Sequence, residues 1–360
     1  MIVSEFIPKP YKSLLDSGSV AYSSPSNIAL IKYWGKKAHQ IPANPSISFT
    51  LNNCKTQTTL SFEKKTTAGF SFNLFLGGKI QEDFKPKIEQ FFKRIEAYIP
   101  FLTAYHFTIE TSNTFPHSSG IASSASGMSA LALCLVQLES YLSPEISKAF
   151  FNKKASFLAR LGSGSACRSI EGPMIVWGAH ANITGSSDLI GVKYPYEIHP
   201  NYNNFRDTIL LVDKGEKQVS STVGHDLMHG HPFAEQRFEQ AYSNMDVLIE
   251  VLKIGDLKAF ISIVEREALT LHAMMMSSDP YFILIKPNTL EIINKIWAFR
   301  KKTGLHICFT LDAGANVHVL FPENEAKEIQ EFIKKALLMH CQNEQFIQDS
   351  LGDGAQPIKI

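Results

Sequence analysis

Two kinds of hydrophobic periodicity alternate along the chain. Apolar residues recur at helical spacing in several segments. These segments, which we expect to form helices, are residues 86–99, 122–138, 152–160, 234–252, 257–276, 289–302 and 323–338. Short runs typical of strands precede the helices in the first half. They are either continuously apolar or alternate apolar and polar residues. The pattern therefore predicts a mixed sheet-and-helix first domain and an α+β protein overall.

The expected strands are short and bounded by turn-forming residues. They are Asn27–Ile31, Ser46–Leu51, Thr56–Phe62, Phe70–Leu76, Phe107–Thr111, Met174–Trp177, Thr208–Asp213 and two strands within residues 305–321. The alternation in Ser46–Leu51 and Thr56–Phe62 is typical of two strands that pair with each other. A turn at Gly77-Gly78 follows the fourth strand.

The length of 360 residues favours two domains rather than one core. A polar stretch from residue 182 to 207, with several glycines, prolines and tyrosines, marks the expected boundary. We therefore divide the chain into domains at residues 1–205 and 206–360. Both are expected to contribute to one site.

The overall charge excludes some classes of partner. A formal net charge of +1 gives no extended basic surface, so nucleic acid and anionic membranes are not expected as main partners. Five widely spaced cysteines without a CxxC pair are typical of reduced thiols, and the N-terminus lacks the pattern of an export signal. These features favour a cytoplasmic protein.

The stretch Thr114–Gly127 (TFPHSSGIASSASG) is a candidate anion-binding loop. Small residues allow a ligand to approach the backbone, and a helix is expected to start near Ala122. Because the first N–H groups of a helix have no partners within it, a phosphate is stabilised there. The simpler interpretation is a Ser-rich surface turn before a buried helix.

Two further segments combine cations with turn-forming residues. The strand Asn27–Ile31 is followed by Lys32-Tyr33-Trp34-Gly35-Lys36. The two lysines of this segment either converge on a polyanionic ligand or remain solvated at a strand edge. Gly162-Ser-Gly-Ser-Ala-Cys-Arg168 offers hydroxyls and a guanidinium suited to carboxylate or phosphate, or is a flexible turn. It is not a dinucleotide fingerprint, because Cys167 stands in place of the third glycine.

Asp312 lies between the two strands of residues 305–321, within Leu311-Asp-Ala-Gly-Ala-Asn316. It is either a turn former or, beside cations such as Lys32, an ionised group facing a substrate hydroxyl. A hydroxyl-rich turn is expected at Gln218–Gly224. The following histidines, His225, His229 and His231, are spaced like metal ligands, but few carboxylates lie near them and a metal site is not favoured.

Four of these runs together resemble the mevalonate diphosphate decarboxylase family of the GHMP small-molecule kinase superfamily. They are NIALIKYWGK at Asn27–Lys36, FPHSSGIASSASG at Phe115–Gly127, GSGSACRS at Gly162–Ser169 and TLDAGANV at Thr310–Val317, in the family's order. The resemblance implies a two-domain GHMP-kinase-like fold with a ferredoxin-like α/β-sandwich as the C-terminal domain. It spans most of the chain.

The resemblance also implies a reaction. The family uses Mg²⁺ and ATP to phosphorylate the 3-hydroxyl of 5-diphosphomevalonate, and then releases CO₂ and phosphate to give isopentenyl diphosphate. Members are often homodimers. By resemblance, Asp312, Lys32 and Arg168 are the expected catalytic residues.

The expected binding residues fall into two sets, both assigned by resemblance. Those for the substrate are Tyr33, Trp34, Gly35, Lys36, Ser163, Gly164, Ser165, Ala166, Cys167, Arg168, Ser221 and Thr222. Those for ATP are Pro116, Ser118, Ser119, Gly120, Ile121, Ala122, Ser123 and Ser124, with Ser123 and Ser124 also near the metal.

The chain departs from the family pattern at three places. His117 lies in the Ser-rich loop, His225 stands where a methionine often follows the hydroxyl turn, and Lys85 is the nearest cation to a missing substrate-contacting arginine. A 5-phosphomevalonate decarboxylase, a mevalonate 3-kinase and an ordinary GHMP kinase therefore stay open as alternatives. So does a binding protein without catalytic activity on the same scaffold.

Overall fold

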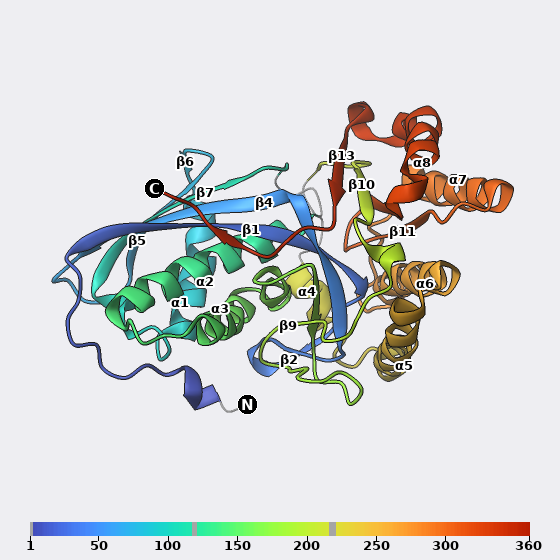
Figure 1. Ribbon diagram of the computed structural model, residues 1–360. Coiled ribbons are helices and arrows are strands. Elements are labelled where there is room, and N and C mark those ends of the chain that lie inside the picture. Colours follow the sequence, from blue (N-terminus) through green and yellow to red (C-terminus); the bar gives the residue numbers. More distant parts are fainter. Residues whose placement is uncertain (1–2, 117–120, 216–220) are drawn as a thin grey trace.

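The computed structural model describes residues 3–116, 121–215 and 221–360, with the backbone alone for Ser221 and Thr222. Figure 1 shows two sheets, each with its own group of helices. The first sheet has the strand order β14-β1-β4-β7-β5-β6, and β8 and β9 extend it from β4. The second has the order β11-β12-β10-β13. The predicted two-domain α+β fold is confirmed.

The strands of the first sheet are mostly antiparallel, with β5 and β7 the parallel pair. Their bounds are β1 Ser17–Ile31, β4 Ser46–Lys64, β5 Ser71–Leu76, β6 Lys79–Ile80, β7 Tyr105–Asn113, β8 Met174–Trp177, β9 Val192–Lys193 and β14 Gln356–Pro357. A separate short pair consists of β2 Lys36–Lys37 and β3 Ile41–Pro42.

The prediction of two paired strands at Ser46–Leu51 and Thr56–Phe62 is wrong. Both belong to the single strand β4, which pairs with β1 on either side of a register shift at residues 51–54. The intervening residues form an irregularity within the strand, where the carboxylate of Asp349 accepts hydrogen bonds from the backbone N–H groups of Asn52, Asn53 and Cys54 at 2.8 Å. A distant side chain thus replaces the turn that the local pattern indicated.

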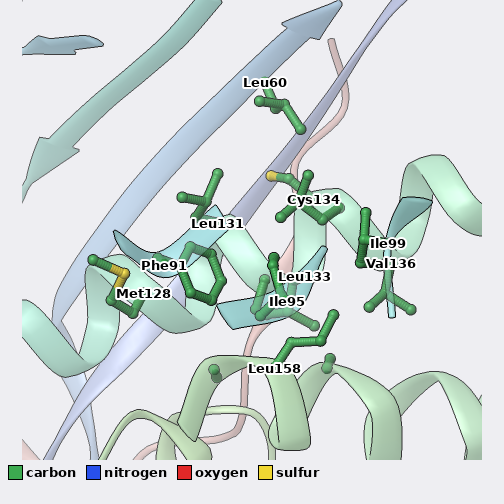
Figure 2. Close-up of a cluster of buried hydrophobic side chains, with 14 of the residues drawn as sticks. Leu60, Phe91, Ile95, Ile99, Met128, Leu131, Leu133, Cys134, Val136 and Leu158 are labelled. Atoms are coloured by element: carbon green, nitrogen blue, oxygen red, sulfur yellow. The ribbon is translucent and has the colours of Figure 1, made fainter. Parts of the chain in front are cut away.

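Three helices cover one face of the first sheet (Figure 1): α1 Lys85–Ile95, α2 Ser123–Leu142 and α3 Lys148–Gly162. Figure 2 shows the core between them, where Leu60 of β4 faces Leu131 and Cys134 of α2. Helix α2 is long and apolar enough to span a bilayer, but 72% of its most apolar window is buried inside the protein. It is the central core helix that the sequence predicted.

The second sheet is antiparallel throughout. Its strands are β10 Arg206–Leu210, β11 Cys308–Thr310, β12 Val317–Phe321 and β13 Phe346–Ser350, and the helices beside it are α5 Ala234–Ile254, α6 Leu257–Met276, α7 Pro287–Thr303 and α8 Ala326–Phe332. The helix expected at 323–338 is interrupted, because a π-helical turn, Ile333–Leu337, follows α8.

Apolar packing and a strand pairing both join the two halves. One hydrophobic cluster contains Phe49 from the first sheet, Phe205 just before β10 and Phe260 from α6. In addition, β14 returns to pair with β1, so the last residues of the chain lie on the first sheet (Figure 1). The division at residues 205 and 206 stays a prediction.

Candidate active site

The site is centred on an ion pair between the two halves of the chain. Lys32 follows the last residue of β1, and Asp312 lies between β11 and β12. Lys32 Nζ is 3.0 Å from Asp312 Oδ1, and Lys32 is only 1% exposed. Burial lowers the pKa of Lys32, while the neighbouring Asp312 carboxylate acts in the opposite direction. Docking of the two halves therefore creates this pair.

Arg168 is a second buried cation, and its charge interacts electrostatically with both members of the pair. It lies in the 3₁₀ segment Gly164–Ser169 and is 4% exposed. Its Nε donates to Asn27 Oδ1 at 3.2 Å and its Nη1 donates to Ser46 Oγ. Both partners are neutral, and among the described residues no carboxylate lies within ion-pair distance of Arg168. A buried guanidinium held only by neutral groups is suited to an anionic ligand.

The segment from Tyr33 to Lys36 turns sharply at Gly35. Gly35 has φ +97°, and a Cβ there would come within 2.9 Å of the Phe238 ring, so the turn requires glycine. Trp34 is buried in a small apolar cluster with Met228 and Leu271. Lys36 Nζ is 3.3 Å from Asp226 Oδ1. The turn thus separates a buried Trp34 from a partly exposed cation.

Tyr33 forms one wall of the site. Its ring packs against Trp177 at 4.6 Å and His225 at 4.2 Å between centroids. Gly164 lies against it, since a Cβ at Gly164 would be 2.8 Å from the Tyr33 hydroxyl oxygen. Burial raises the pKa of the Tyr33 hydroxyl, which therefore stays protonated at neutral pH.

The remaining residues of the GSGSACR segment differ in their exposure to solvent. Ser163 and Ser165 are half-buried, and the Ser165 carbonyl oxygen accepts a hydrogen bond from Asn27 Nδ2 at 3.3 Å. Ala166 and Cys167 are buried in the core. Ala166 and Cys167 therefore offer no exposed side chain to a ligand, whereas the two serines offer hydroxyls.

The amino end of α2 provides a second group of predicted residues. Ala122 is its N-cap, with φ +45°, and the alanine side chain does not cap the helix. Ile121 is buried, while Ser123 is half-buried and Ser124 exposed. Pro116 ends the preceding described segment, and residues 117–120, including the predicted Ser118, Ser119 and Gly120, lie outside the described residues.

A lysine that the sequence did not single out lies at this helix end. Lys87 of α1 donates from Nζ to Ser124 Oγ at 3.1 Å. Lys85, the cation that the sequence pointed to, instead pairs with Glu82 at 2.8 Å. The uncapped N–H groups and Lys87 together form a positively polarised surface. Only the helical spacing of α1 was visible in the sequence, and it does not indicate which lysine faces α2.

The expected hydroxyl turn at Gln218–Gly224 is in part a helix, α4 Ser221–Asp226. Residues 216–220 and the side chains of Ser221 and Thr222 lie outside the described residues. His225 at the end of α4 accepts a hydrogen bond at Nδ1 from the Gly35 N–H at 3.0 Å. This contact ties α4 to the segment that follows β1.

His225 is neutral at physiological pH. Burial, helped by Lys36 and Arg168, lowers its pKa to about 3. Because Nδ1 accepts a hydrogen bond from the Gly35 N–H, the ring hydrogen lies on Nε2, which makes His225 a neutral donor beside Tyr33 and Lys36. Within the described ranges, no group of three or more His, Cys, Asp or Glu side chains is arranged for a metal ion.

Other buried polar residues at the site were not predicted. Glu267 and Arg237 bind the backbone of Lys32, and His272 lies 3.1 Å from the backbone oxygen of Asp312. All three lie on helices whose periodicity indicates only which face is buried. A charged residue on that buried face is the one signal that would have drawn attention to Glu267 and Arg237.

This fold, with its cation-rich site at a domain junction, defines a member of the GHMP kinase superfamily. The profile of the diphosphomevalonate decarboxylase-like N-terminal domain matches residues 24–188, and that of the mevalonate 5-diphosphate decarboxylase C-terminal domain matches residues 208–358. The chain belongs to the diphosphomevalonate decarboxylase family.

Individual relatives agree with this. The diphosphomevalonate decarboxylase of Ganoderma lucidum is 31% identical over 333 residues, which cover 87% of this chain and 80% of the relative. The solved structure of mevalonate diphosphate decarboxylase from Enterococcus faecalis has a TM-score of 0.80 and 27% identity, covering 96% of this chain and 100% of that one. A further structure, MDDEF in complex with MVAPP, AMPPCP and magnesium, has a TM-score of 0.81 and 29% identity over the same shares.

Proposed function

We propose that this protein catalyses the ATP-dependent decarboxylation of (R)-5-diphosphomevalonate to isopentenyl diphosphate, CO₂, ADP and phosphate, in the mevalonate pathway of isoprenoid biosynthesis. The observation that carries the proposal is the buried cluster of Lys32, Asp312 and Arg168, in which Arg168 is held by neutral partners. The family membership supports the same reaction.

The first step is phosphoryl transfer to the 3-hydroxyl of the substrate. Asp312 accepts the hydroxyl proton while the hydroxyl oxygen attacks the γ-phosphorus of ATP, and the bond to the ADP oxygen breaks. Lys32, 3.0 Å from Asp312, pairs with that carboxylate and offsets negative charge on the phosphoryl group. Positioning and charge neutralisation are the main requirements of such a transfer.

The second step breaks two bonds. The 3-phosphate leaves with its bonding electron pair, and positive charge develops at the tertiary carbon. The bond to the carboxylate carbon then breaks, and its electron pair forms the new double bond as CO₂ departs. We assign to Arg168 the binding of the carboxylate before it leaves, because a guanidinium fork matches the two oxygens of a carboxylate.

ATP and Mg²⁺ fit the surface at the amino end of α2. The uncapped N–H groups of this helix, with Lys87 and the hydroxyls of Ser123 and Ser124, provide donors for phosphate oxygens. Mg²⁺ in nucleotide sites is bound largely by the phosphates and water, so one or two protein oxygens complete its coordination. The hydroxyls of Ser123 and Ser124 are our candidates for these oxygens.

Substrate preference separates the proposed reaction from its alternatives. Purified protein is incubated with Mg²⁺-ATP and 5-diphosphomevalonate, 5-phosphomevalonate or mevalonate, and CO₂, ADP and phosphate are quantified. We expect equal amounts of the three products, with the highest kcat/KM for 5-diphosphomevalonate. ADP without CO₂ favours a simple kinase, preference for 5-phosphomevalonate favours a monophosphate decarboxylase, and no turnover favours a binding protein.

We further propose a cytoplasmic location and a homodimer. The five cysteines, Cys54, Cys134, Cys167, Cys308 and Cys341, are all free and buried, which suits a reducing compartment. The dimer follows from the family resemblance alone. Sedimentation velocity at micromolar concentration tests it, with a single species of one-chain mass as the contrary result.

A further inference from the structure

The backbone of Lys32 lies beyond the last hydrogen-bonded pair of β1. Pairing of β1 with β4 ends at Ile31 and Ile47, so the sheet leaves the backbone groups of Lys32 unpaired. The Lys32 N–H instead donates to Glu267 Oε2 at 2.9 Å. The Lys32 carbonyl oxygen accepts from Arg237 Nη2 at 3.1 Å and from Asn44 Nδ2 at 2.9 Å. Side chains therefore fix both backbone groups of this residue.

Glu267 and Arg237 also bind each other. Both are fully buried, with Arg237 Nη2 2.6 Å from Glu267 Oε2 and Nη1 3.0 Å from Oε1. Asn244 Nδ2 donates to the same Oε1. A two-bonded, buried pair has a fixed geometry, and removing one partner leaves an uncompensated charge. The pair joins α5 to α6 and holds the end of β1 against them.

The other member of the ion pair is held from the same helix. His272 lies five residues after Glu267 on α6, and its Nε2 is 3.1 Å from the backbone oxygen of Asp312. His272 is 2% exposed, and burial is the main cause that lowers its pKa to about 4, so the ring is neutral. Since a carbonyl oxygen only accepts, Nε2 carries the hydrogen.

We propose that α6 sets the geometry of the Lys32–Asp312 pair, with Glu267, Arg237 and His272 as positioning residues that act through the backbone of the two catalytic residues. Five residues of an α-helix rise about 7.5 Å, so a continuous α6 keeps its two anchor points at a constant separation. The inference rests on the proposed function, because it gives these residues a role in that reaction.

The anchors are expected to affect the placement of the reacting groups more than the affinity for ATP or substrate. A displacement of about 1 Å at the reacting groups costs on the order of 100-fold in rate. Loss of an anchor is therefore expected to lower kcat, while the KM values for ATP and substrate, which other residues determine, change little.

The His272 anchor is tested with two variants. His272→Leu removes the donor, and we expect kcat to fall about 100-fold with both KM values within about threefold. In His272→Gln the side-chain amide replaces the Nε2 donor, and kcat is expected to recover to within about fivefold of wild type. Equal kcat in folded His272→Leu and wild type overturns this part, and so does a failure of His272→Gln to improve on His272→Leu.

The Glu267–Arg237 anchor is tested by removing both partners. The double variant Glu267→Met/Arg237→Met replaces a buried pair by apolar side chains, which is often neutral for stability. We expect it to fold and to lose about 100-fold in kcat. The matched control, Glu265→Met/Arg300→Met, removes another ion pair of α6, with N and O 2.6 Å apart, that does not touch Lys32. The control should keep kcat within about twofold.

Hydrogen exchange separates this inference from the proposed function. A peptide covering residues 29–34 reports the Lys32 amide, and the Glu267→Met/Arg237→Met variant should exchange it at least about tenfold faster, unlike the control. If the variant exchanges faster and the wild-type protein shows no turnover, the proposed reaction is rejected and the anchor is kept. Unchanged exchange, or an equal loss of kcat in the control, would overturn the anchor.

Discussion

Lys32 Nζ and Asp312 Oδ1 lie 3.0 Å apart although 280 positions separate the two residues in the chain. One follows a strand of the first sheet and the other a strand of the second. The pair exists only when the two halves are docked, so it couples the catalytic groups to the integrity of the junction.

Asp312→Ala tests the role of the carboxylate. We expect kcat to fall at least about 1,000-fold while substrate affinity stays within about tenfold, because the group acts mainly in the transition state. Steady-state kinetics and isothermal titration give the two values. A large loss of binding with kcat retained would contradict the role.

Arg168→Gln tests the carboxylate-binding assignment. Removing the guanidinium should lower kcat/KM for the substrate about 100-fold and make ADP release exceed CO₂ release. Arg160→Gln is the control, since Arg160 is also buried but donates to the carbonyl oxygens of Leu189 and His39. It should lower Tm and leave ADP and CO₂ equal. Equal ADP and CO₂ in Arg168→Gln, with kcat/KM unchanged, would reject the assignment.

Lys87 is expected to act on ATP alone. Lys87→Ala removes the cation beside Ser124, and KM for ATP should rise about tenfold while KM for the substrate is unchanged. Lys85→Ala removes a neighbouring cation whose partner is Glu82, and should change neither value by more than about twofold. The assignment fails if the two variants behave alike.

The sequence located the site better than it located the contacts that hold it. Lys32, Arg168 and Asp312 belong to sequence motifs, and in the structure Lys32 and Asp312 form an ion pair whose charges interact with Arg168. The residues that fix them, such as Glu267 and His272, come from an amphipathic helix far away in the chain. Periodicity identifies a buried face but not which backbone group a buried side chain meets.

The same limit explains the error in β4. The polar residues Asn52 and Asn53 interrupt an alternating pattern, which locally favours a turn. Asp349, 296 or more positions away, binds their backbone N–H groups, and they form an irregularity inside one strand instead of a turn between two. Tertiary contacts of this kind override local propensity, and a single sequence does not reveal them.

Stability should depend on pH through two buried histidines. The pKa values of His225 and His272 are about 3 and about 4 in the folded protein, below the ordinary value of about 6.5. Between the folded and unfolded pKa values, the unfolded chain binds more protons than the folded protein. The contribution of the two histidines to the free energy of unfolding is therefore complete above pH 6.5 and is lost as the pH falls toward 4. Well below pH 6.5 each histidine removes about 1.4 kcal/mol per pH unit from the free energy of unfolding.

Urea unfolding at pH 7.5 and pH 5 measures this loss. His225→Phe should reduce the pH dependence by the share of one histidine, whereas His229→Phe, at an exposed position, should leave it unchanged. An identical pH dependence in wild type and His225→Phe would contradict the neutral, buried state of His225.

Isotope transfer tests the central claim most directly, because it follows the atom that links phosphorylation to decarboxylation. The substrate is 5-diphosphomevalonate with ¹⁸O in its 3-hydroxyl, incubated with Mg²⁺-ATP and analysed by mass spectrometry of the released phosphate. If the 3-hydroxyl is phosphorylated before CO₂ leaves, the label appears in inorganic phosphate in equal amount to CO₂. Unlabelled phosphate accompanying CO₂ would contradict the account.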